Sequence, residues 1–445
     1  MIRCGPSIAL PGGPLIVLEP ERKLPLVQFL LRIEAGSAFE PPTLGGMAEL
    51  TTRLLRRGTA DRTGPELERR LDELGASLAE DLDHDAVDLS LEVLSRDAEE
   101  GLALLLEVAF RPSFPEADIE RVRGLLVDDI AALADEPAEL ADLIFSAEYY
   151  APHPYHRSEW GTRESVQRIT REDLVAFHRR HFRPERTILG ISGDFDPDRL
   201  IEVTRRLLPA GHGSAPRGPV STERPRGVQG LRVVAAHRPG IEQSHIRIGG
   251  GLVRADHPDF NAIEIDNTIL GGLYTSRLVE SIRIRHGLSY DIASSFDAGR
   301  DPGPFVVETY TRHDRAVETI RRIREELERF SADGPTDDEI ERALRYHEGA
   351  MAFEIETAES LMEERMELRF HGLPESTLVD LPAQLRALDR DTLRRVANEH
   401  FPAHDLLVVV VTDLAKNRDA LAGLGPITEI DARTGRPSSD PESDS

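Results

Sequence analysis

Apolar and polar residues alternate along several segments of the chain. Residues 27–33 place Val, Phe, Leu and Ile at every second position, and residues 87–93 repeat the pattern with Val and Leu. A period of two predicts strands with one face in the core, as in antiparallel sheets. Apolar residues at the longer spacing of a helix occur in residues 67–74, 195–208 and 315–330. These patterns predict an α+β protein in which helices pack on one face of an antiparallel sheet.

The same landmarks occur twice, in the same order, at a spacing of about 220 residues. Three pairs of segments match: 32–33 with 247–248, 117–121 with 338–342, and 181–182 with 400–401. The second pair opens a predicted helix after a proline, and the third precedes an apolar strand. The sequence therefore predicts two homologous domains of the same α+β design.

Composition marks the boundaries of these domains. Residues 213–228 are rich in Gly, Pro and Ser and lack apolar periodicity, which is typical of a linker. The predicted domains are therefore residues 1–212 and residues 229–426. The remaining residues, 427–445, are acidic and rich in Ser and Pro, so we expect a disordered tail.

The sequence carries 80 acidic and 54 basic residues, a formal net charge of −26. This negative field argues against nucleic acid and anionic membranes as partners, although it also serves simply to keep the surface soluble. The one cysteine, Cys4, permits neither an intrachain disulfide nor a cysteine-based metal cluster. The first residues lack the apolar core of a signal peptide, and no apolar run is long enough for membrane insertion. We expect a cytoplasmic protein, with a periplasmic location as the alternative.

A predicted helix near the N-terminus carries the first candidate chemistry. An Ala-Gly-Ser strand end at residues 35–37 and a proline-rich turn precede it, and it closes on Gly58 and Thr59. This frame resembles the insulinase/pitrilysin family of metallopeptidases, whose members carry an inverted zinc motif, H-x-x-E-H, on this helix. The resemblance extends over roughly residues 8 to 420. It implies the family's half-clamshell fold of two homologous domains.

The resemblance places Glu49, Thr52 and Arg53 at the three motif positions, and Asp129 at the family's later acidic ligand. Zinc needs imidazole, thiolate or carboxylate donors, and the general base must be a carboxylate. Arg53 is a permanent cation without a lone pair, and the hydroxyl of Thr52 is no base near neutral pH. We therefore expect degenerate zinc positions, with no metal and no other cofactor bound by this chain.

Three interpretations of this helix remain. In the simplest, its apolar residues form a core stripe and its charged residues are merely solvated. In the second, Arg53 replaces the charge of the missing metal by pairing with Glu49, four residues earlier, or with the more distant Asp129. In the third, Glu49 and Asp129 act as zinc ligands in a stand-alone peptidase.

A second signature lies at residues 276–290, where Ser-Arg-Leu and Ile-Arg precede Gly287 and a strand that begins Leu-Ser-Tyr. This resembles the C-terminal signature of the same family. The resemblance implies that Arg283 and Tyr290 reach the zinc site of an opposite half and donate hydrogen bonds to the scissile carbonyl as it becomes an oxyanion. Without the resemblance, the two residues would be a solvated charge and a packed ring.

A retained frame with lost metal ligands resembles the non-catalytic subunit of two-chain bacterial members of the family. The resemblance implies a subunit of a heterodimeric zinc-dependent endopeptidase that degrades peptides. Its partner is expected to be a similar-sized catalytic subunit that carries H-x-x-E-H and the zinc. Peptides would bind by adding a strand to a sheet edge. The alternative is a purely structural or chaperone-like core subunit of a larger complex, without a peptidase role.

Overall fold

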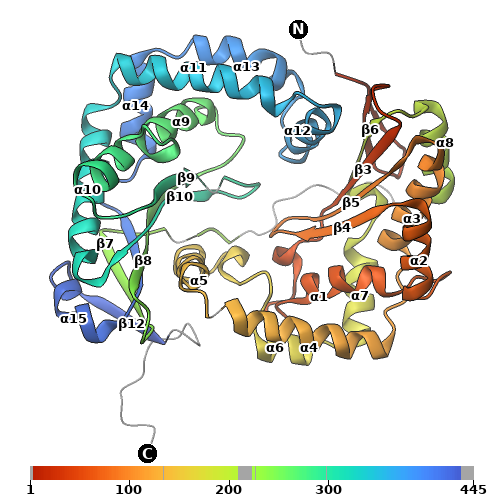
Figure 1. Cartoon of the computed structure of the whole chain (residues 1–445), viewed down its shortest axis with the longest axis horizontal. Coiled ribbons are helices and arrows are strands. Elements are labelled where there is room, and N and C mark those ends of the chain that lie inside the picture. The colour runs from red at the N-terminus through yellow and green to blue at the C-terminus, as the bar shows by residue number, and fades with distance from the viewer. Residues whose placement is uncertain (1–3, 134, 209–222, 226, 297, 432–445) are drawn as a thin grey trace, which may run out of the picture. The chain divides into compact units, whose positions relative to one another are not determined.

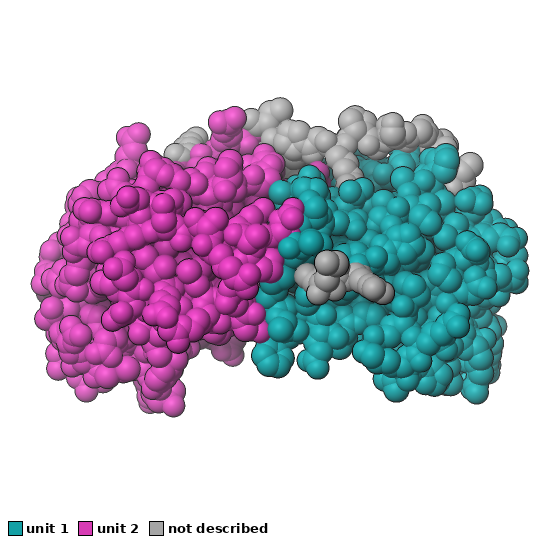
Figure 2. Space-filling model, turned by 90° about the horizontal axis from the view of Figure 1, so that it is seen from above, with its two compact units in different colours: residues 1–130, 157–222, 351–379 teal, residues 131–156, 223–350, 380–445 magenta. Residues whose placement is uncertain are grey.

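The computed structural model describes the following residues: 4–133, 135–208, 223–225, 227–296 and 298–431. The chain divides into two compact units, which Figure 2 colours separately. Unit 1 comprises residues 1–130, 157–222 and 351–379, and unit 2 comprises residues 131–156, 223–350 and 380–445. In the described part of the chain, each unit contains one six-stranded sheet with helices packed on it (Figure 1). The predicted α+β class with two similar domains is confirmed.

The sheet of unit 1 has the strand order β1-β2-β6-β3-β5-β4. Its strands are β1 (Ser7–Ala9), β2 (Leu15–Pro20), β3 (Leu26–Ile33), β4 (Ser77–Leu82), β5 (Val87–Leu94) and β6 (Thr187–Gly193). The alternating segments of the sequence form β3 and β5, which pair antiparallel along their whole length. Strands β2 and β6 pair in parallel, so the sheet is mixed and not purely antiparallel as expected.

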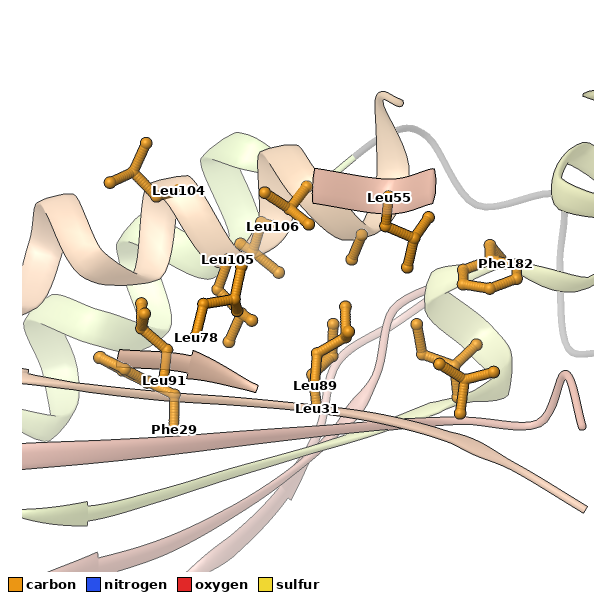
Figure 3. Packing of buried hydrophobic residues seen from close by; sticks show 14 of the residues in the cluster. Phe29, Leu31, Leu55, Leu78, Leu89, Leu91, Leu104, Leu105, Leu106 and Phe182 are labelled. Atoms are coloured by element: carbon orange, nitrogen blue, oxygen red, sulfur yellow. The ribbon is translucent and has the colours of Figure 1, made fainter. Parts of the chain in front are cut away.

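Helices cover the main face of this sheet. They are α1 (Met47–Leu54), α2 (Gly64–Leu74), α3 (Ala98–Phe110), α4 (Glu116–Leu133), α6 (Arg163–Arg168), α7 (Arg171–His181) and α8 (Pro197–Leu207). Figure 3 shows side chains of α3, among them Leu105, directed toward Phe29 and Leu91 of the sheet. Because side chains alternate strictly between the two faces along β3 and β5, the buried apolar side chains of both strands lie on one face of the sheet and pack against these helices.

Helix α12 (Ala358–Phe370) belongs to unit 1 although it lies in the second half of the sequence. It forms a separate hydrophobic cluster with β2 and β6, made of Met362, Met366, Phe370, Val17 and Ile188. Because Val17 alternates along β2 with Ile16 and Leu18 of the main core, α12 covers the opposite face of the sheet. The sheet therefore has helices on both faces, whereas the sequence predicted them on one.

The sheet of unit 2 has the strand order β12-β7-β11-β8-β10-β9. Its strands are β7 (Leu231–His237), β8 (Gln243–Val253), β9 (Ile292–Phe296), β10 (Gly303–Arg312), β11 (Leu406–Thr412) and β12 (Ile427–Asp431). The helices that lie wholly or mostly in this unit are α5 (Pro137–Tyr150), α9 (Phe260–Asn267), α10 (Ala316–Asp333), α11 (Asp337–Glu354), α13 (Ser376–Arg386), α14 (Arg390–His400) and α15 (Leu414–Ala422). Strand β7 pairs in parallel with β11 and β12, so this sheet is mixed too.

Helix α5 lies on the sheet of unit 2 although it belongs to the first half of the sequence. A Cβ on Gly249 of β8 would lie 2.6 Å from the ring of Phe145 on α5, so glycine permits this close approach. In the duplicated sequence α5 corresponds to α12, because each follows the long helix of its repeat. Each sheet is thus covered by the equivalent helix from the other half of the sequence.

The repeated Arg-Ile landmark has a role in this arrangement. In unit 2, Arg247 of β8 donates hydrogen bonds to Asp142 of α5 at 2.7 Å and to the Ala138 carbonyl at 3.3 Å. In unit 1, its counterpart Arg32 donates a hydrogen bond to Glu367 of α12. It also forms an ion pair with Asp88 on the neighbouring strand β5. The two repeats therefore hold the contributed helix with the same arginine.

The tail prediction is wrong for residues 427–431, because these form β12 and pair in parallel with β7. Residues 432–445, and residues 213–222 and 226 of the predicted linker, lie outside the described residues. Among the residues that are described, no helix is both long enough and apolar enough to cross a membrane.

Candidate functional site

The first candidate region, in unit 1, is built on helix α1. The helix begins after Gly46, whose φ of 86° favours glycine, and a Cβ there would lie 2.5 Å from the Trp160 carbonyl oxygen. The buried Glu40 carboxyl group accepts the N–H groups of Gly46 at 3.1 Å and Ala48 at 2.7 Å. Burial raises the pKa of Glu40 to about 8. These hydrogen bonds and the conformation of Gly46 fix the N-terminus of helix α1. They thereby position the degenerate zinc motif that follows.

Arg53 joins the two acidic residues at the degenerate zinc positions. Its Nε donates to Glu49 Oε1 and its Nη1 to Asp129 Oδ2, each at 2.5 Å. The guanidinium carbon also lies 5.4 Å from the ring centroid of Trp160, a cation–π contact. Burial lowers the pKa of Arg53, but the hydrogen bonds to Asp129 and Glu49 outweigh it and raise the pKa above its ordinary value. The sequence predicted that Arg53 pairs with Glu49 or with Asp129, and in the structure it pairs with both, so the solvated alternative is wrong for this residue.

The donor set of this region does not fit a zinc ion. Both carboxylates already bind one guanidinium, which places a cation where they converge. The hydroxyl oxygen of Thr52, at the position of the family's catalytic base, is buried and has no hydrogen-bond partner among the described residues. A threonine hydroxyl is neither a general base near neutral pH nor a usual zinc ligand. Its presence at this position therefore supports the same conclusion. We therefore derive no metal chemistry from this helix.

A second group of metal-binding residue types, in unit 2, was missed by the sequence analysis. The ligand atoms of His257, Asp259 and His400 all lie within 4.8 Å of one another. However, Arg395 donates to both carboxylate oxygens of Asp259, at 2.7 and 2.9 Å. Hydrogen bonds from Arg395 lower the pKa of Asp259 to about 2. The guanidinium binds both oxygens of this carboxylate, and His400 Nε2 lies 3.4 Å from one of them, so the group is an ion-pair cluster that no local sequence spacing could have revealed.

The other predicted site residues lie at a π-helix in unit 2. This element, η7 (Val279–Arg285), carries Arg283, and the His286 N–H bonds the Ser281 carbonyl five residues earlier at 3.2 Å. A shorter π-helix, η6 (Thr268–Gly272), precedes it. π-Helical turns are rare and occur frequently at functional sites. The sequence predicted a helix at Arg283. In the structure this helix is a π-helix, which is wider than an α-helix.

The guanidinium carbon of Arg283 lies over the rings of two tyrosines. It lies 4.7 Å from the ring centroid of Tyr290 and 5.0 Å from that of Tyr274. The rings are 74% and 63% exposed, respectively, so this cluster faces solvent. The structure thus brings the predicted Arg283 and Tyr290 together. The sequence analysis missed Tyr274, because no motif singles out this residue in the segment Gly271-Gly272-Leu273-Tyr274.

A polar cavity of about 450 Å³ also borders η7, between residues of α10 and α11. Glu280 and Arg285 of η7 line it, but Arg283 does not. Four of its arginines already pair with carboxylates: Arg277 with Glu339 at 2.7 Å, Arg329 with Glu326 at 2.8 Å, Arg285 with Glu280 at 3.4 Å and Arg390 with Asp337 at 3.5 Å. Because Arg283 does not line the cavity, the cavity is a separate feature from Arg283 and its two tyrosines.

Comparison with known proteins defines the class to which this fold and these residues belong. Residues 15–163 match the model described as insulinase (peptidase family M16), and residues 168–346 match that of the peptidase M16 inactive domain. The chain is 26% identical to an uncharacterized zinc protease of Streptomyces coelicolor, over 95% of this chain and 90% of that protein. It is 22% identical to the non-peptidase homolog YmxG of Helicobacter pylori, over 91% and 93%.

A solved structure supports the fold. A peptidase M16 inactive domain from Pseudomonas fluorescens superposes with a TM-score of 0.85 and 24% identity, over 92% of this chain and 98% of that one. The two family models together span most of the sequence, one after the other. The chain belongs to the insulinase family of metallopeptidases, peptidase family M16.

Proposed function

We propose that this chain is the non-catalytic subunit of a heterodimeric zinc-dependent endopeptidase that degrades peptides. The observation that carries the proposal is the ion pair of Arg53 with Glu49 and Asp129, which fills the family's metal position with a guanidinium. A chain with this donor set depends on a partner for zinc and for the general base. That partner is a similar-sized subunit with an intact H-x-x-E-H motif.

Within the complex, this chain forms part of the chamber wall and supplies Arg283 and Tyr290 as transition-state donors. A guanidinium and a phenol aimed at the scissile carbonyl stabilise the developing oxyanion more than the ground state. Two properties support this role. Arg283 donates no hydrogen bond to any residue that the structure describes, and the ring of Tyr290 is largely exposed. Both groups are free to meet a substrate.

The substrate in this proposal is an extended peptide that adds a strand to a sheet. Strand β4 forms one edge of the sheet of unit 1, and it packs against α1. Main-chain hydrogen bonds at such an edge give affinity with little dependence on side chains. Broad peptide specificity follows from this mode of binding.

The first test is to recover the chain from its own host at native expression and to identify what co-purifies by mass spectrometry. A similar-sized protein with H-x-x-E-H supports the proposal and permits reconstitution of the peptidase. In the reconstituted complex, Arg283→Ala or Tyr290→Phe should lower turnover by about 100-fold, the usual effect of losing one oxyanion donor, without preventing assembly. Arg285→Ala is the matched control, since this arginine lies on the same π-helix and pairs with Glu280. Unchanged turnover in the first two variants would remove them from the mechanism.

The alternative is a purely structural or chaperone-like core subunit of a larger complex, without a peptidase role. It is favoured by the similarity to a protein described as a non-peptidase homolog. Recovery of the chain alone, or with an unrelated complex, would support this alternative over the proposal.

A further inference from the structure

Tyr274 belongs to the same cluster as Arg283 and Tyr290, although it lies in the turn between η6 and η7. It follows η6, whereas Arg283 lies on η7 and Tyr290 follows that helix. Both rings approach the guanidinium within about 5 Å, yet they make no ring contact with each other among the described residues. The guanidinium carbon therefore lies over two separate rings.

The arginines around Arg283 are engaged in ion pairs. Arg277 forms a fork with the Glu339 carboxylate at 2.7 and 2.8 Å, and Arg285 lies 3.4 Å from Glu280. Arg283 has no such partner within the described residues, in a chain with 80 acidic and 54 basic residues. Its contacts to the two rings stabilise the cation, while its N–H donors bind no hydrogen-bond acceptor among the described residues.

This geometry selects the kind of ligand that can bind. The N–H donors of a guanidinium lie in its plane, and the central carbon of this one lies over the rings of both tyrosines. An acceptor must therefore approach in the plane, as the sp² oxygen of a carbonyl or a carboxylate does. The rings also restrict the rotamers of Arg283, so less entropy is lost when an acceptor binds.

We propose that Tyr274 is a positioning residue, which together with Tyr290 holds Arg283 as a binding site for a planar sp² oxygen of a peptide main chain. The role of this oxygen in cleavage rests on the function proposed above. The binding itself is a property of this chain alone. Either an internal carbonyl or the C-terminal carboxylate of a peptide offers the required chemistry.

The test uses the full-length chain with ¹⁵N-labelled arginine. Loss of one Nε–Hε NMR signal in Arg283→Lys assigns the signal of Arg283. The probe is N-acetyl-tetra-alanine, as the free acid and as the C-terminal amide. In the unaltered chain, ring currents should displace the Arg283 signal, and the probe should shift it further.

Replacing Tyr274 tests the positioning role directly. Tyr274→Leu should move the Arg283 signal and weaken probe binding about two- to fivefold, as the loss of one exposed cation–π contact predicts. Tyr274→Phe keeps the aromatic face and should restore both readouts. Tyr346→Leu is the matched control, because this tyrosine is exposed in the same unit but makes no cation–π contact among the residues that the structure describes.

Each outcome decides the proposal. Equal binding of acid and amide identifies a carbonyl as the ligand, and binding of the acid alone identifies a carboxylate; both support the site. No shift with either probe, or a Tyr274→Leu variant that behaves as the unaltered chain, overturns it. Because these measurements need no second subunit, a positive result with no zinc-bearing partner recovered from the host would refute the proposed function alone.

Discussion

Replacing Arg53 with leucine tests the ion pair at the degenerate zinc position. The side chains of Glu49, Arg53 and Asp129 are 11%, 24% and 46% exposed, respectively. The substitution removes the cation and leaves the nearly buried Glu49 carboxylate without a charged partner. Asp129 loses less, since water reaches almost half of its side chain. The leucine retains apolar packing beside Trp160.

The expected magnitude lies between two limits. Breaking a fully buried pair costs about 3–5 kcal/mol, whereas an exposed pair is worth about 0.2–1 kcal/mol. The Glu49 pair lies between these limits and the Asp129 pair near the lower one. We expect Arg53→Leu to reduce the free energy of unfolding by about 2 kcal/mol, which lowers the Tm of a unit of this size by about 4–8 °C.

The chain carries a local probe for this measurement. Trp160 is its only tryptophan and contacts the Arg53 guanidinium, so its fluorescence reports the unfolding of unit 1. Adding Glu49→Gln to Arg53→Leu should recover about 1 kcal/mol, because it removes the unpaired charge. Arg69→Leu, at an exposed position of α2, should change stability by less than about 0.5 kcal/mol. An Arg53→Leu variant as stable as the unaltered protein would refute the pairing argument.

Three further predictions concern other parts of the chain. Burial raises the pKa of Asp266 to about 8, so the folded state keeps a proton that the unfolded state releases above about pH 4. Stability should therefore fall as the pH rises from about 4 to 8, and Asp266→Asn should flatten that decline in denaturant midpoints measured across the range. Arg365→Met should destabilise unit 1 by about 3 kcal/mol in thermal unfolding, because it leaves the buried Glu19 without its cation; a loss below about 1 kcal/mol would contradict this. Ile430→Ala, at a buried position of β12, should cost about 2–4 kcal/mol in denaturant unfolding, whereas a disordered tail would tolerate it.

Local patterns determined much of this fold. The alternation at residues 27–33 and 87–93 is a property of each segment alone, because successive side chains of any strand point to opposite faces. The pair of Arg53 with Glu49 could likewise be anticipated from their spacing of four on one helix. Asp129 lies 76 residues from Arg53, so its part in the pair was predicted from the family frame and not from any local spacing.

Other features could be decided only by the folded chain. The apolar residues of α5 and α12 indicate that part of each helix is buried, but not that each packs on the sheet built by the other half. Strand β12 was misjudged for the same reason, since its acidic and polar residues gain a strand conformation from pairing with β7. Tyr274 and Arg283 are nine positions apart, and only the turn after η6 brings ring and guanidinium together. The sequence by itself thus determined which elements form and which residues are chemically suited to a site, because propensity and periodicity are local. Tertiary structure decided which faces and side chains meet, because those contacts join segments that are distant along the chain.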